Sequence, residues 1–247
     1  MNKKSAPAND SAFICVENML AHIHPKQDTR SIAETLRERF VSSNAMFSAE
    51  AHLLKKSGLH PHDALLMSNI PALARYVART GFDKNYRLDH LENAGKYLTA
   101  NFYGYQVEHF HVLHLDARGR LIERTALHEG IADCSLFNLK KLLSEIVRVS
   151  PKAVILSHNH PGGTLRPSQE DINCTVDALR ALSVVGIPML DHIIIAGGEV
   201  ISLRENGFVP AAYWLQQAPE NRMLRNFLLL PGEDPPVPKR KKPKNPL

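Results

Sequence analysis

The sequence lacks any apolar run that approaches the roughly 20 residues needed to cross a bilayer, which argues against a membrane-spanning helix. Its first twenty residues include two lysines but no uninterrupted apolar region, so we expect no secretory signal. Only three residues are cysteine, namely Cys15, Cys134 and Cys174. Their odd number and wide spacing argue against a disulfide framework or a cysteine zinc knuckle. We therefore expect free thiols in a reducing compartment, and a cytoplasmic protein.

The chain also lacks a charge bias outside its C-terminal tail. Its net charge of +5 comes from 30 basic and 25 acidic residues. The segment 239–244, KRKKPK, holds five of the basic residues and no acidic one, so the rest of the chain has 25 of each sign. A nucleic-acid binder usually carries a basic face on its folded domain. The composition gives no support for such a face, although a local basic patch could still exist. The tail could bind DNA nonspecifically and in a salt-dependent way.

The first hundred residues are expected to be mostly helical. In the stretch RSIAETLRERF, which follows the candidate caps Asp28 and Thr29, apolar residues recur at every fourth position, as one buried helix face requires. Further along, we expect short helices that are broken at Gly58, Pro61 and Pro71. This pattern predicts a small all-helical domain.

After about residue 101 the apolar pattern predicts alternating strands and helices. Two strands joined by a turn at 116–119 precede an amphipathic helix, NLKKLLSEIVRV. Five apolar residues of this helix are expected to face the core: Leu139, Leu142, Leu143, Ile146 and Val147. The buried strand KAVILS, the helix DINCTVDALRALSVVG and two final strands, MLDHIIIAGG and EVISLRENG, follow. The alternation predicts an α/β domain with a sheet flanked by helices, and the proline-rich end from residue 231 predicts a disordered tail.

The chemistry is concentrated in SHNHPGGTLRPSQED, residues 157–171. His158 and His160 follow directly on the buried strand, and residues two apart on an extended chain point the same way, so both imidazoles can converge on one ion. A loop of this length can return Asp171, in the first turn of the next helix, to the same point. Two histidines and one carboxylate leave a fourth tetrahedral position for water, as a catalytic zinc site requires.

The same residues also fit an interpretation without a metal. Residues 168–171 read S-x-x-D, close to a capping box, and capping alone would explain Ser168 and Asp171. The histidines would then be ordinary loop residues. The spacing H-x-H is weak evidence by itself, because His22 to His24 and His109 to His111 repeat it without an acidic residue eleven positions on. We interpret both of these pairs as surface or structural histidines.

The order H-x-H-P-x-G followed by P-S-x-x-D, placed between a buried strand and a helix, resembles the JAMM motif of the JAB/MPN metalloenzymes. The form HNHPGGTLRPSQED is similar to that of the bacterial RadC family. EHFHVLHLDARGRLI resembles the opening strand pair of that family and LDHIIIAGGEVISLRENG its closing segment, so the resemblance covers about residues 101–208. It implies a JAB/MPN-like mixed sheet flanked by helices, of the cytidine-deaminase-like kind.

A weaker resemblance concerns the N-terminal half. The stretch HPKQDTRSIAETLRERF is similar to the helical N-terminal region of RadC proteins. LLKKSGLHPHDA resembles a helix-hairpin-helix element in which His60 replaces the second glycine, and this replacement argues against close backbone approach to a phosphate.

The resemblance implies a role for each matching residue. His158, His160 and Asp171 would bind Zn²⁺, and Ser168 would hydrogen-bond the reacting group and stabilise a tetrahedral oxyanion. The acid of the family lies on the opening strand and matches Glu108 in VEHF. It would act as general base for the zinc-bound water and then as acid toward the leaving group. Without the resemblance, Glu108 would be interpreted as an edge-strand carboxylate that faces water.

Several neighbouring residues are expected to serve the structure instead. Asn159 and the loop 161–163 would shape the connection to the helix without carrying chemistry. Asp191 and His192 also match the family pattern, and we expect them to be structural or to support the ligands from outside. Cys174 is expected to be a small core residue and not a nucleophile.

Three functions are weighed on this basis. The first is a zinc-dependent metallopeptidase or related hydrolase, in which metal-activated water attacks a peptide or isopeptide bond of an unknown protein or peptide. The second is a protein associated with DNA repair or DNA binding, in which the JAB domain is mainly an interaction module. The third is an inactive scaffold, which the complete ligand set argues against. Five segments are predicted: an N-terminal extension (1–27), a helix-hairpin-helix-like domain (28–100), the JAB/MPN domain (101–212), a C-terminal extension (213–230) and a disordered basic tail (231–247).

Overall fold

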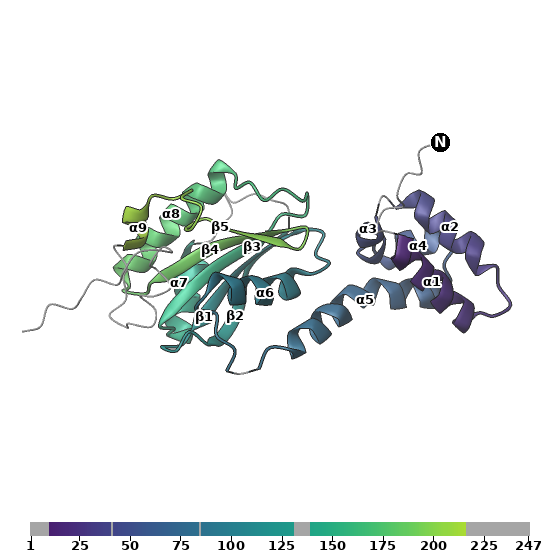
Figure 1. Cartoon of the computed structure of the whole chain (residues 1–247), viewed down its shortest axis with the longest axis horizontal. Coiled ribbons are helices and arrows are strands. Elements are labelled where there is room, and N and C mark those ends of the chain that lie inside the picture. Colours follow the sequence, from purple (N-terminus) through teal and green to yellow (C-terminus); the bar gives the residue numbers. More distant parts are fainter. Residues whose placement is uncertain (1–9, 41, 84, 131–138, 216–247) are drawn as a thin grey trace, which may run out of the picture.

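A computed structural model describes residues 10–40, 42–83, 85–130 and 139–215 (Figure 1). Its helices are α1 (Asp10–Ile23), α2 (Thr29–Arg39), α3 (Ser43–Phe47), α4 (Ala51–Lys56), α5 (Pro61–Thr80), α6 (Leu91–Phe102), α7 (Leu139–Val149), α8 (Gln169–Val184) and α9 (Ala211–Leu215). Its strands are β1 (Glu108–Leu115), β2 (Leu121–Gly130), β3 (Ala153–Asn159), β4 (Met189–Ala196) and β5 (Glu199–Ser202). None of the helices within these ranges is both long and apolar enough to cross a membrane.

The five strands form one mixed sheet in the order β2-β1-β3-β4-β5. β1 is antiparallel to both β2 and β3, β3 is parallel to β4, and β4 is antiparallel to β5. The expected mixed sheet flanked by helices is therefore confirmed. β1, β3 and β4 are buried along their whole lengths, because helices cover both faces of the sheet.

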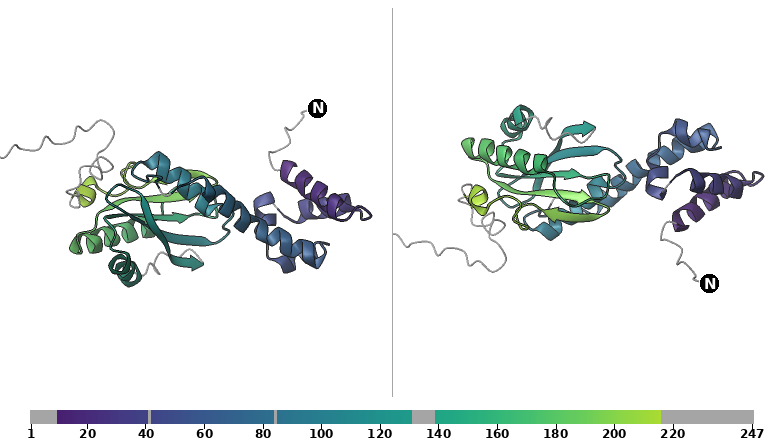
Figure 2. Two further views of the ribbon diagram at one scale, coloured as in Figure 1. Left: turned by 90° about the horizontal axis from the view of Figure 1, so that it is seen from below. Right: turned by 90° about the horizontal axis from the view of Figure 1, so that it is seen from above.

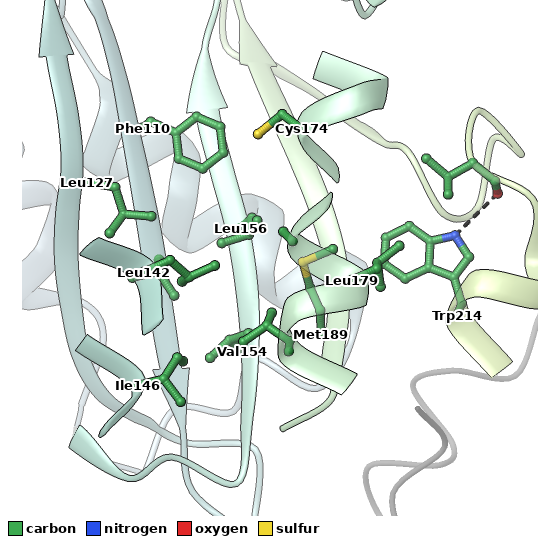
Figure 3. Packing of buried hydrophobic residues seen from close by; sticks show 14 residues of the cluster. Phe110, Leu127, Leu142, Ile146, Val154, Leu156, Cys174, Leu179, Met189 and Trp214 are labelled. Carbon is green, nitrogen blue, oxygen red and sulfur yellow. Dashed lines mark hydrogen bonds between the residues drawn. The ribbon is translucent and has the colours of Figure 1, made fainter. Parts of the chain in front are cut away.

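The two faces of the sheet carry separate cores. Leu98 and Phe102 of α6 pack with Ile155 on one face. Leu156 lies on the opposite face, under α7 and α8, as successive side chains of a strand must alternate. Figure 2 shows α6 on one side of the sheet and α7 and α8 on the other, and Figure 3 shows Phe110, Leu156, Leu179 and their neighbours in the second core.

The N-terminal helices have a core of their own. α1 to α4 and the first turns of α5 surround Leu36, Met46, Leu54 and Met67, at the end of α5 that lies away from the sheet (Figure 1). Asp28 caps α2 as expected, because its carboxylate accepts a hydrogen bond from the Ser31 amide at 3.2 Å. The small all-helical part is confirmed.

The predicted helix break at Pro71 is wrong. α5 continues through this residue from Pro61 to Thr80. Pro71 is buried, and a Cβ added at Gly104 would lie only 2.9 Å from the Pro71 Cβ. A proline inside a helix removes one hydrogen bond, and we attribute the unbroken helix to this close packing.

Some other expectations need correction or have no counterpart in the structure. In α7, Leu142 and Ile146 are buried but Val147 is 75% exposed, because a step of one residue turns the side chain by about 100° around the helix.

Cys15 and Cys174 are free thiols, whereas Cys134 and the tail 231–247 lie outside the described residues. α6 crosses the predicted boundary at residue 101, and residues before it, such as Leu98, pack on the sheet. The domain bounds themselves stay predictions.

Candidate metal centre

Three side chains converge where β3 ends and α8 begins. The Nε2 atoms of His158 and His160 lie 2.9 Å apart. Asp171 places Oδ1 3.1 Å from the first of these atoms and Oδ2 3.5 Å from the second. Donor atoms of a tetrahedral zinc ion lie about 3.3 Å from one another. Among the described residues, these three form the one group of His, Cys, Asp or Glu side chains whose donor atoms could hold a metal ion.

The hydrogen bonds around His158 fix which of its ring nitrogens carries the proton. The Thr175 hydroxyl donates to the Asp171 carbonyl at 2.6 Å, so it must accept from Nδ1 of His192, also at 2.6 Å. Burial, and then the neighbouring His158, hold the pKa of His192 well below its usual value, so that ring is neutral. Its Nε2 therefore accepts from Nδ1 of His158 at 2.9 Å. The lone pair of His158 is left on Nε2, the atom that faces the centre.

His160 reaches the same state by a different contact. Its Nδ1 lies 2.8 Å from the carbonyl oxygen of Thr164, which can only accept, so Nδ1 carries a proton and the lone pair of the neutral ring is on Nε2. When both rings are neutral, the two Nε2 lone pairs face each other at 2.9 Å. This arrangement is repulsive unless a cation, either a proton or a metal ion, lies between them. The donor set therefore fits a metal.

Asp171 serves the helix and the centre at once. Its Oδ2 accepts hydrogen bonds from the Ser168 amide at 2.7 Å and the Ser168 hydroxyl at 2.8 Å, while the Ser168 Oγ accepts from the Asp171 amide at 3.1 Å. This is a complete capping box at the start of α8. The capping and the metal-binding interpretations are thus compatible, because the cap turns Oδ1 toward His158. In this conformation the Ser168 hydroxyl proton is held by Asp171.

Glu108 lies near the three candidate ligands, because β1 runs antiparallel to β3 and so begins beside the end of β3. It lines a cavity of about 680 Å³ together with His160, Ser168 and Asp171. β1 lies between β2 and β3, and Glu108 is only 6% exposed, so the interpretation as a water-facing edge-strand carboxylate is wrong. Burial raises the pKa of Glu108; the charge of Asp171 adds to this increase, and His158 opposes it.

The other histidine pairs do not form such a centre. His109 and His111 of β1 are buried, and their rings stack on those of Tyr105 and Phe102, with centroids 3.5 Å and 4.7 Å apart. His24 instead lies 2.8 Å from the Asp63 carboxylate in the helical part. These contacts agree with structural roles.

Sequence reasoning missed Thr175 and the role of its hydroxyl. Thr175 stands four positions after Asp171 on α8, so both lie on one helix face. That spacing was a usable signal. The partner, His192, comes from β4, whose position beside β3 follows only from the sheet order.

The sequence also matches a known protein family and several known relatives. The profile of a family described as "RadC-like JAB domain" matches residues 88–208, which include β1, the histidine loop and α6. A UPF0758 protein of Shouchella clausii is 32% identical over 179 residues, which cover 72% of this chain and 77% of the relative. UPF0758 proteins of Geobacillus thermodenitrificans and Trichodesmium erythraeum are 30% and 43% identical, over 62% and 40% of this chain and 67% and 40% of the relatives.

Proposed function

Because the chain belongs to the RadC family of JAB-domain proteins, we propose that it is a zinc-dependent hydrolase that cleaves an amide bond, of the peptide or isopeptide kind, in a protein or peptide. The observation that supports this proposal most directly is the convergence of Nε2 of His158 and Nε2 of His160, 2.9 Å apart, with the carboxylate of Asp171. Such a pair is suited to a cation, and the adjacent carboxylate makes the donor set typical of zinc in a hydrolase.

The residues would hold the ion through Nε2 of His158, Nε2 of His160 and a carboxylate oxygen of Asp171. A zinc ion bound there would polarise the amide carbonyl and lower the pKa of a water molecule in the fourth position. The His192 and Thr175 contacts would keep the His158 ring in the tautomer that presents its lone pair.

Glu108 would move the proton. Its carboxylate would accept a proton from the attacking water and then deliver it to the departing nitrogen. Burial raises the pKa of Glu108 above its ordinary value, which favours its acting as an acid as well as a base. The Ser168 hydroxyl, once turned away from Asp171, would donate to the negative charge that develops on the carbonyl oxygen.

The proposal is tested first by metal content, on protein prepared without a histidine tag. We expect about one zinc per wild-type chain and none in D171A, as measured by mass spectrometry. The zinc-loaded wild type is then incubated with an internally quenched fluorescent peptide library. E108Q should keep its zinc and cleave at least about 100-fold more slowly. Equal rates for E108Q and wild type would refute the assignment of the base, and a wild type without zinc after reconstitution would refute the metal site.

A further inference from the structure

We propose that Asn159 is a positioning residue for the catalytic acid, because its side chain holds the backbone on both sides of Glu108. This inference rests on the hydrolase proposed above. The contacts that carry it join the middle residue of the H-N-H motif to the start of β1, and neither the family match nor the motif assigns them a role.

The backbone pairing of β1 with β3 stops just before the acid. Paired residues run from Leu115 with Ala153 to Phe110 with His158. If the pairing continued in this register, Glu108 would lie opposite His160. The His109 amide would then bind the carbonyl of residue 159, and the amide of residue 161 would bind the carbonyl of residue 107. Residue 161 is proline and has no N–H to donate.

The Asn159 side chain takes the place of both of these backbone partners. Its Oδ1 accepts a hydrogen bond from the His109 amide at 2.8 Å, and its Nδ2 donates to the Val107 carbonyl at 3.1 Å. Asn159 is only 5% exposed, so water competes little for these groups. The sites require one acceptor and one donor, which a primary amide offers and a carboxylate does not.

The position of Asn159 in the chain gives these bonds their importance. Its two neighbours in sequence, His158 and His160, supply two of the candidate metal donors. The peptide that carries the metal ligands therefore also holds the peptide that carries the acid, and a shift of one relative to the other is resisted. A misplacement of about 1 Å between reacting groups can cost up to about 100-fold in rate.

The test compares N159D and N159A with N101A. Asn101 is a matched control, because it is 1% exposed and its side chain donates to the Tyr97 carbonyl at 2.8 Å within α6. We expect N159D and N159A to keep their zinc, and to lower kcat on a cleaved peptide of the library about 10- to 100-fold with little change in KM. In the E108Q background, N159D should lower the rate no further, because it acts through Glu108.

Two readings on the zinc-loaded protein do not depend on turnover. In N159A the His109 amide should exchange its hydrogen faster, and the ¹³C resonance of the Glu108 carboxyl should move, while both stay unchanged in N101A. The proposal is overturned if both readings match the wild type, or if N159A loses the His109 protection and keeps the full kcat. If the zinc-loaded wild type cleaves no peptide, the hydrolase proposal fails. The amide exchange of His109 and the ¹³C resonance of Glu108 then decide by themselves whether Asn159 positions Glu108.

Discussion

The groups around a histidine ring in this protein decide whether its pKa is lowered or raised. His111 is 1% exposed, stacks on Phe102 and lies 3.2 Å from the Arg124 guanidinium through Nδ1. Burial, then the charges of Arg124 and His109, lower the pKa of His111 to about 3. His160 differs because, although burial opposes it, the hydrogen bond to Asp171 raises its pKa.

The lowered pKa of His111 predicts acid sensitivity. The unfolded chain binds a proton at His111 below about pH 6.5, whereas the folded chain does so only near pH 3. The free energy of unfolding is therefore unaffected by this residue above pH 6.5 and falls as the pH is lowered from 6.5 toward 3. H111F should therefore lose less stability than wild type between pH 7.5 and 4.5, by up to about 1.4 kcal/mol per pH unit. Urea unfolding of the metal-free proteins measures this difference. Parallel stability curves for the two proteins would contradict it.

His192 is predicted to tune metal binding without touching the metal. H192F removes the acceptor that orients the His158 ring, and loss of such an outer contact typically weakens metal affinity about 10- to 100-fold. H114F is the control, because His114 is also fully buried and also bonded to a threonine, Thr125, at 3.1 Å. Zinc titration against a chelating dye should show weaker binding for H192F only. Equal affinities for both variants would show that the outer contact is dispensable.

At the scale of one element, Ser168 and Asp171 in the first turn of α8 both cap this helix and orient the candidate metal ligand Asp171. S168A should lower the free energy of unfolding by about 1 kcal/mol, the usual effect of a lost N-cap, and should also weaken zinc binding. D28A removes the cap of α2 and should destabilise the protein by a similar amount with no effect on zinc. Urea unfolding and zinc titration of both variants measure the two effects. If D28A weakened zinc binding as much as S168A, the effect would be one of general stability.

The elements that local pattern defines could be predicted from the sequence. β3, α8 and the convergence of His158, His160 and Asp171 depend on a strand, a cap and a short loop that adjoin in the chain. The burial of Glu108 could not be predicted without the family, because it depends on β1 lying between β2 and β3. α5 continues through Pro71, which packs closely against Gly104, more than thirty residues away in sequence.

The amide of Asn159 shows the same limit on what sequence reveals. The sequence shows an asparagine two positions before a proline, and we expected it only to shape the loop. Its actual partners, Val107 and His109, lie about fifty residues earlier in the chain. Only the register of β1 against β3 brings them within reach.

At the scale of the whole molecule, charge is concentrated at one end of the chain. Five basic residues lie in 239–244, outside the described part, and the rest of the chain is balanced. We expect any binding to duplex DNA to weaken steeply with salt and to disappear when residues 231–247 are deleted, or when the five basic residues are replaced by serine at unchanged length. Electrophoretic or anisotropy titrations at two salt concentrations measure this. Binding that survives both changes would assign DNA contact to the folded part instead.

The three candidate ligands come from one stretch, residues 158–171, whereas the contact that holds the acid joins residues fifty apart. Contacts that are close in sequence form faster than distant ones, so the ligand stretch is expected to form before the contact that holds Glu108. The candidate ligands can come together early, whereas Glu108 joins them only when β1 pairs with β3. If the chain is the hydrolase proposed above, metal binding would thus precede catalytic activity during folding.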